Sequence, residues 1–197
     1  WELLMNGLKP YACGVVNHPL IDAMVALRTK DGVTPDSVES VNAQVHPLVV
    51  ELVNRPEPSS GLEGKFSFQH SMAVGLIDGA AFPAQYSDDR VNDSVVRQLR
   101  QRIQVTVDSS VSEDATIVTL TLKDGRIYTE TVEHATGAPE NPMTDAQLEE
   151  KFRGLAEDVL PRPRCKRLLN MLWNLDKVDD IRELAALLRV RHRSVRD

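Results

Sequence analysis

The sequence is poor in several features that mark whole classes of protein. Its only cysteines, Cys13 and Cys165, stand far apart in 197 residues, which excludes a disulfide framework and a cysteine metal site. No apolar run approaches the roughly 18 residues that span a bilayer. Low cysteine use is typical of a reducing compartment, so we expect a cytoplasmic protein with no membrane partner.

A concentrated basic surface is also missing. The formal net charge is -6, and phosphate backbones are bound by clustered Lys and Arg, so we expect no nucleic-acid partner. The sequence has no glycine-rich phosphate loop, no paired-cysteine motif and no nucleophile elbow, which predicts no cofactor and no metal. The basic tail at residues 189–196 is interpreted as a solvated helix end rather than a nucleic-acid contact.

What the sequence does contain is a mixture of helical and strand patterns. Its clearest element is a hairpin, because two alternating β-branched runs at residues 116–122 and 127–132 flank Asp124 and Gly125. Residues 38–53 are rich in valine, and a strand is expected there at residues 40–45, with a continuation past His46 and Pro47 as the alternative; another is expected at 103–107. Helices are expected over residues 18–30, 63–79, 88–102, 144–155, 168–173 and 181–188.

This order of elements predicts an α+β fold, with a small antiparallel sheet and a hairpin packed by helices, followed by a C-terminal helical segment. Residues 1–8 are interpreted as the end of a preceding helix, 9–160 as the α+β domain and 161–197 as the helical segment. Because Trp1 enters directly into a helical pattern, we expect the chain to be a piece of a longer one. A trimmed start is the alternative.

The helix expected over residues 63–79 carries Lys65, Ser67 and His70 at its polar start. Ionisable groups at the mouth of an apolar helix are costly unless they are paired or used. His70 shares a largely apolar face with Ser67, so it is either a core histidine bonded to a carbonyl or a general acid or base at a cleft wall. Lys65 lies about 140° from His70 on a regular helix and is either a solvated lysine or a ligand-binding one.

Two further candidates lie near the start of the chain. Lys9 precedes Pro10 in a rigid passage, where it is either a surface charge or a side chain presented into a cleft. His18, followed by Pro19, is either a helix-start residue or an anion ligand beside free amide groups. The remaining histidines show no pairing pattern and are interpreted as structural or surface residues: His46, His134 and His192.

Four segments, at residues 8–13, 18–22, 64–79 and 141–152, occur in an order and spacing that resemble the MmgE/PrpD family. Its members include 2-methylcitrate dehydratases, cis-aconitate decarboxylases and iminodisuccinate epimerases. Each segment alone is a weak signal, but together they are specific. The resemblance implies a large helical domain and a smaller α+β lid, with the active site in the cleft between them, and the present residues correspond to the lid and the helices that follow it.

The resemblance also implies a reaction. Such enzymes are cofactor-independent lyases (dehydratases or decarboxylases) or isomerases that act on a small di- or tricarboxylate, such as a 2-methylcitrate-like acid, by α-proton abstraction. Lys9 and His70 would be catalytic, and His18, Lys65 and Ser67 would bind substrate. His70 stands where the family often has tyrosine and Ala12 where many relatives have proline, so the substrate lining differs.

Two expectations concern assembly. We expect a homodimer of the full-length protein, and an inactive isolated chain because its cleft would have only one wall. The alternative is a non-catalytic interaction or dimerisation module that keeps the family fold, with the hairpin and the apolar C-terminal helices as its partner surface.

Overall fold

The computed structural model describes residues 1–189, so His192 and all but the first residue of the basic tail lie outside the described part of the chain. Contacts divide the chain into two compact units, Trp1–Met143 and Thr144–Asp197. The domain boundary expected at residue 160 falls inside the second unit. Among the described helices, none is long and apolar enough to cross a membrane.

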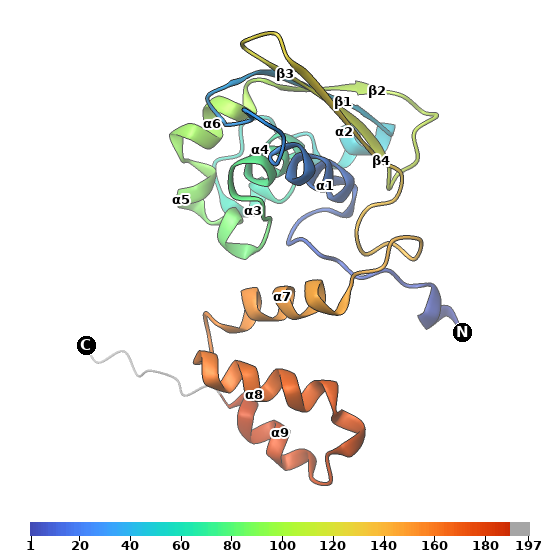
Figure 1. Ribbon diagram of the computed structural model, residues 1–197, viewed down its shortest axis with the longest axis vertical. Coiled ribbons are helices and arrows are strands. Elements are labelled where there is room, and N and C mark those ends of the chain that lie inside the picture. The colour runs from blue at the N-terminus through green and yellow to red at the C-terminus, as the bar shows by residue number, and fades with distance from the viewer. Residues whose placement is uncertain (190–197) are drawn as a thin grey trace, which may run out of the picture. The chain divides into compact units, whose positions relative to one another are not determined.

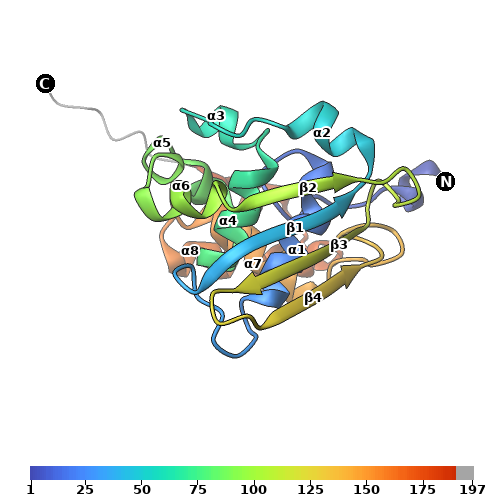
Figure 2. The same ribbon diagram turned by 90° about the horizontal axis from the view of Figure 1, so that it is seen from above.

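The first unit contains a four-stranded sheet in the order β2-β1-β3-β4, seen face-on in Figure 2. The strands are β1 (Val38–Val45), β2 (Ile103–Val107), β3 (Thr116–Leu122) and β4 (Ile127–Val132). The predicted α+β class is confirmed. The sheet is mixed rather than purely antiparallel, because the long helical connection from β1 returns β2 in the same direction.

Helices pack against one face of this sheet, with α1 (His18–Leu27) and α4 (Phe68–Asp78) beneath the strands in Figure 1. Leu20 and Met24 of α1 and Leu120 of β3 are fully buried in the resulting core. The two helices approach closely at Gly75, where a Cβ would lie 3.3 Å from the Cβ of Met24. The core therefore lies between the sheet and this helix pair, and the elements around it carry the candidate site.

The strand predicted at residues 40–45 is confirmed within β1, but its alternative continuation past Pro47 is wrong. Residues 47–53 form helix α2 (Pro47–Val53), with Pro47 in its first turn, where a missing N–H costs nothing. The ring nitrogen Nδ1 of His46 accepts a hydrogen bond from the Leu48 N–H at 3.2 Å and caps the helix. These start signals outweigh the strand preference of three valines.

Two predicted helices are broken. The run at 63–79 forms α3 (Gly61–Gly64) and α4, and the side chain of Ser67 caps α4 by accepting from the His70 N–H at 3.1 Å. The run at 88–102 forms α5 (Asp88–Val91) and α6 (Ser94–Arg100), capped by Asp93. In both runs a capping side chain inside an otherwise helical pattern begins a new helix.

The predicted hairpin and two helix boundaries are confirmed. Gly125 adopts a φ of 88° between β3 and β4, a conformation that favours glycine. Gly79 ends α4 in the left-handed conformation, with a φ of 68°. Thr144 and Gln147 form the predicted capping box at the start of α7 (Asp145–Ala156).

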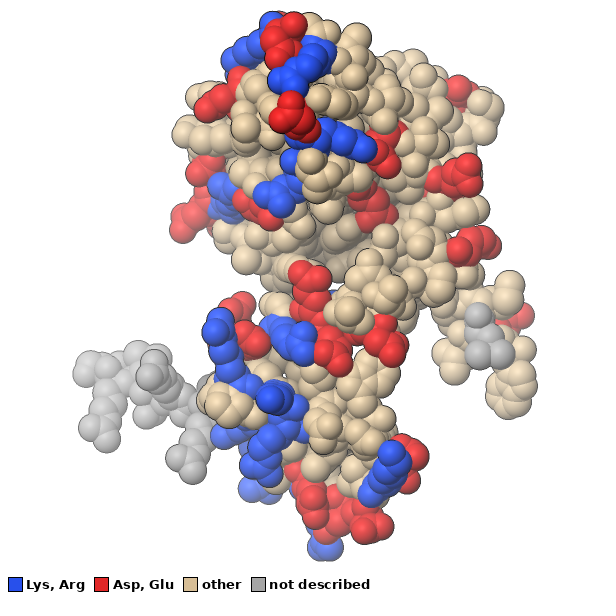
Figure 3. All heavy atoms as spheres, viewed as in Figure 1, with Lys and Arg blue, Asp and Glu red and all other residues tan. Residues whose placement is uncertain are grey.

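The second unit is helical and has a small core. It consists of α7, α8 (Arg162–Trp173), the short η4 (Leu175–Lys177) and α9 (Ile181–Leu188). Its buried apolar residues are Leu160, Cys165, Leu168 and Leu187. Lys and Arg side chains gather over α8, as Figure 3 shows. The surface of these helices therefore carries charged side chains together with exposed apolar ones.

Candidate functional site

A pocket of about 330 Å³ in the first unit brings together two of the predicted site residues, Lys9 and His18. Lys9 comes from the extended passage before α1, and His18 is the first residue of α1. The opposite wall is the loop at residues 135–140, which follows β4, together with Asp114 from the loop before β3. The volume suits a small organic acid.

Two glycines hold the Lys9 passage against the loop that faces it. The Leu8 N–H donates to the Gly137 carbonyl at 2.7 Å. Gly137 has a φ of 90°, and a Cβ there would lie 1.9 Å from the Leu8 carbonyl oxygen. A Cβ on Gly7 would lie 2.5 Å from the Gly137 oxygen. The backbones cross so closely that only glycine fits, and this crossing places Lys9 in the pocket.

Asp22 ties two segments of the pocket to α1. Its Oδ1 accepts from the Tyr11 hydroxyl, and its Oδ2 accepts from the Thr136 N–H at 2.6 Å. Burial raises the pKa of Asp22, while the hydrogen bonds from Tyr11 and Thr136 oppose that rise. The Tyr11 ring packs edge-on against the His18 ring, with centroids 5.5 Å apart. Asp22 therefore positions the Lys9 passage and the opposite loop, and Tyr11 in turn packs against His18.

Sequence reasoning missed Asp22, although a signal existed. His18 and Asp22 are separated by four residues within a predicted helix, so they share a face. A carboxylate one turn below a candidate histidine is a natural positioning residue.

The pocket carries charges of both signs. Lys9 supplies an exposed ammonium group, and His18 is buried. Asp114 and Glu140 both stand on the wall opposite Lys9 and His18. An anionic ligand would therefore be attracted to the Lys9 side and repelled by two carboxylates on the other.

His70 lies elsewhere, fully enclosed in the first unit. Its Nε2–H donates to the Gln85 carbonyl at 2.8 Å, and among the described residues its buried Nδ1 has no hydrogen-bond partner. Burial lowers the pKa of His70 to about 4, and the positive charges of Arg100 and Arg90 also lower it, so the ring is neutral at neutral pH. His70 does not line the pocket of Lys9, and the expectation that it faces a cleft does not fit its enclosure. Its catalytic role stays a prediction.

Lys65 and Ser67 also lie away from the pocket. Lys65 follows α3 and is half-buried, and its carbonyl accepts hydrogen bonds from the Gly14 N–H at 3.1 Å and from Asn17 Nδ2 at 3.3 Å. The buried Ser67 caps α4 and donates to Gln69 Oε1 at 3.2 Å. In the structure both residues stabilise the segments around them, and their contact with a substrate stays a prediction.

Comparison with known proteins agrees with the resemblance in the sequence. A family model for the MmgE/PrpD C-terminal domain matches residues 11–177. Cis-aconitate decarboxylase of Mus musculus is 29% identical over 190 residues, 92% of this chain and 39% of that protein. The Homo sapiens protein of that name is 29% identical over 144 residues, 71% of this chain and 30% of that protein. The one from Aspergillus terreus is 26% identical over 206 residues, 95% and 41% respectively. The chain thus spans about two fifths or less of the length of these relatives.

Proposed function

Since the chain belongs to the MmgE/PrpD family, whose C-terminal domain it matches over most of its length, we propose that it forms part of a lyase acting on a small di- or tricarboxylate. The observation that carries the proposal is the pocket that joins Lys9 and His18. The names of the relatives favour decarboxylation of a cis-aconitate-like acid over dehydration of a 2-methylcitrate-like acid.

The chemistry of such a reaction suits the pocket residues. Loss of carbon dioxide breaks a carbon–carbon bond and leaves an electron pair on the remaining carbon, which must take up a proton. Lys9 offers a compact positive charge that binds a substrate carboxylate and a proton that can be transferred. His18 contributes a second polar group on the same wall. We assign carboxylate binding and proton handling to Lys9, and substrate binding to His18.

The residues outside the pocket have a different place in the proposal. His70, Lys65 and Ser67 surround the start of α4, and Lys65 bonds through its carbonyl to the segment leading into α1. This arrangement supports an indirect contribution through the shape of the pocket. Further site residues would come from a region that corresponds to the additional length of the relatives. The homodimer is proposed from the resemblance, and the cytoplasmic location from the low cysteine content.

Turnover of a panel of substrates tests the proposal. The longest natural polypeptide containing these 197 residues would be assayed for carbon dioxide release from cis-aconitate and for dehydration of 2-methylcitrate. We expect turnover of at least one polycarboxylate and a loss of at least about 100-fold in kcat/KM for Lys9→Gln. Lys123→Gln is the matched control, because Lys123 is an exposed lysine outside the pocket.

Two results would contradict the assignment. Equal activity of Lys9→Gln, His18→Gln and Lys123→Gln would show that the pocket is not the site of the reaction. A folded protein that turns over no polycarboxylate would instead favour the non-catalytic interaction module. Circular dichroism of each variant would confirm that the fold is retained.

A further inference from the structure

Three side chains that are far apart in the sequence meet at one end of the β3–β4 hairpin: Asp114, His134 and Glu140. Thr116 of β3 pairs with Val132 of β4, so the antiparallel register continued by two residues sets Asp114 opposite His134. The Ala135 N–H donates to the Asp114 carbonyl at 2.9 Å and extends this pairing beyond the strands. The hairpin therefore determines that these two side chains are neighbours.

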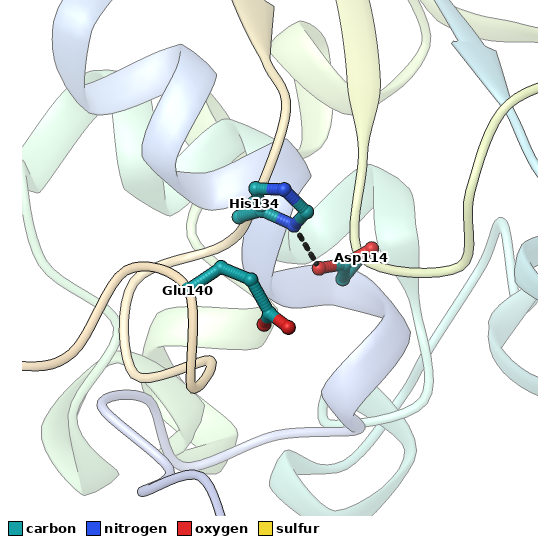
Figure 4. A group of neighbouring side chains, drawn as sticks. All are labelled: Asp114, His134 and Glu140. Atoms are coloured by element: carbon teal, nitrogen blue, oxygen red, sulfur yellow. Dashed lines mark hydrogen bonds and ion pairs between the residues drawn. The ribbon is translucent and has the colours of Figure 1, made fainter.

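Glu140 is brought back to the pair by a tight turn. Gly137 adopts its positive φ within this loop, and the Gly137 N–H donates to the Asn141 carbonyl at 2.8 Å. As Figure 4 shows, Asp114 comes from the loop before β3, His134 and Glu140 come from the segment after β4, and the three side chains lie close together. One ligand atom from each of the three lies within 4.8 Å of the others.

From this arrangement we propose that Asp114, His134 and Glu140 bind a divalent first-row transition-metal ion, with Zn²⁺ as the probe that suits them. One imidazole nitrogen and two carboxylate oxygens are a mixed ligand set that Zn²⁺ accepts readily, whereas Mg²⁺ prefers oxygen ligands alone. Three protein ligands leave a coordination position open to water or a bound anion.

The bonds required are within reach of these side chains. The His134 Nδ1–H donates to the Asp114 Oδ2 at 2.8 Å. The ion takes the place of this proton, which leaves to solvent from a protonated ring or moves to Nε2 in a neutral one, so the bound imidazole is neutral. In a tetrahedral set with metal–ligand bonds of about 2.1 Å, ligand atoms lie about 3.4 Å apart, so a movement of up to about 1.4 Å is needed to draw together atoms that now lie within 4.8 Å of one another. His134 and Glu140 are exposed and can make that movement.

Neighbouring groups already hold the Asp114 carboxylate and the backbone that carries His134. Ser112 Oγ donates to the other oxygen of Asp114, Oδ1, at 2.6 Å. The Asn141 Nδ2 donates to the His134 carbonyl at 3.0 Å. Such outer hydrogen bonds hold a ligand in place before the metal arrives.

The position of the cluster leaves space around the ion. Asp114 and Glu140 line the Lys9 pocket, and His134 and Glu140 also line a second hollow of about 550 Å³ that includes Asp22. An ion between the two hollows would offset the two carboxylates that otherwise repel an anion from the Lys9 pocket. Binding of the metal is independent of the proposed lyase activity, so each can fail without the other.

Isothermal titration of the whole chain with ZnCl₂ tests the site. We expect one bound ion per chain, with affinity at least about tenfold weaker in His134→Ala and in Glu140→Gln. His46→Asn is the matched control, because it removes a histidine outside the cluster and keeps a side chain that can cap α2. A zinc-dependent rise in the melting temperature should accompany binding in the wild type and the control.

The contrary results are equally clear. Zinc affinity that is the same in His134→Ala and His46→Asn would overturn the site. So would Mg²⁺ binding as tightly as Zn²⁺ with no loss in His134→Ala, since that pattern would reveal only an acidic surface. Circular dichroism would show that the exposed substitutions leave the fold intact.

Discussion

The two units of this chain differ in how much of their apolar surface they bury. In the first unit, α1, α4 and the sheet enclose a continuous core. In the second unit, α7 has no buried residue, and large apolar side chains on its helices are exposed, among them Leu155, Trp173 and Ile181. Hydrophobic burial is the main favourable term in folding, so the first unit should account for most of the stability.

This difference explains where a precise site can form. The Lys9 pocket depends on a backbone crossing at Gly7 and Gly137 and on the buried carboxylate of Asp22. Each of these contacts is held in place only where the surrounding elements are well packed. The continuous core of the first unit provides that packing. The second unit carries no comparable group of polar contacts among its described residues.

The largest effect is expected in the core of the first unit. Replacing the fully buried Leu120 by Ala should reduce the free energy of unfolding by about 4 kcal/mol, because it leaves a cavity beside α1 and β1. Leu155→Ala in α7 should change it by less than about 0.5 kcal/mol, because Leu155 is 47% exposed. Urea unfolding, with hydrogen exchange of the sheet amides and of the α7 amides as the readout, measures the loss of stability in each variant. Equal losses in the two variants would contradict the comparison.

A second prediction concerns pH and the enclosed His70. Its pKa of about 4 in the folded state is below the ordinary value of 6.5, so between these values the unfolded state binds more protons. The stabilisation is complete above pH 6.5 and is lost as the pH falls to 4, with a total on the order of 3 kcal/mol. His70→Gln keeps a donor for the Gln85 carbonyl and cannot be protonated, so its urea midpoint should depend less steeply on pH in that range. An unchanged pH dependence would show that His70 is not held neutral by burial.

The glycine crossing allows a matched pair of substitutions. Gly137 and Gly125 have nearly the same φ, 90° and 88°, but an added Cβ clashes only at Gly137 and meets nothing within 4 Å at Gly125. Ala at either position should cost about 1 kcal/mol of backbone strain, and Gly137→Ala should cost about 2 kcal/mol more from the clash with Leu8. Thermal unfolding compares the two variants, and similar melting temperatures would mean that the crossing adjusts freely.

The smallest effect is expected on the surface of the second unit. Arg153 in α7 forms an ion pair with Glu149 one turn earlier, and the arginine side chain is 49% exposed. Arg153→Gln should lower the stability by about 0.5 kcal/mol or less, and the difference should vanish at high salt. A loss above about 2 kcal/mol would show that the second unit depends on its surface charges.

Much of the fold was predictable because its signals are local. Alternating residues around Asp124-Gly125 gave the hairpin, and Thr144 with Gln147 gave the start of α7. Errors arose where one local preference opposed another. The valines after Pro47 favour a strand, but the cap at His46 begins a helix there, and Ser67 and Asp93 begin new helices inside helical patterns.

The candidate site was less predictable because it depends on contacts between distant residues. Lys9 and His18 were predicted as site residues and do share a pocket. His134 was interpreted as a structural or surface residue with no pairing pattern, because Asp114 lies 20 residues away and only the register of β3 and β4 brings them together. The enclosure of His70 likewise depends on Gln85 and Tyr86, which follow in a separate segment.

The most direct test of the central claim, that Lys9 binds a substrate carboxylate, is a double-mutant cycle between protein and substrate. The kcat/KM would be measured for wild type and Lys9→Gln in the longest natural polypeptide, with a tricarboxylate and with an analogue in which one carboxylate is replaced by an amide. If Lys9 binds that carboxylate, each single change should lower kcat/KM at least about tenfold, and the two together should lower it little further. Fully multiplicative losses for every carboxylate of the substrate would show that Lys9 binds none of them.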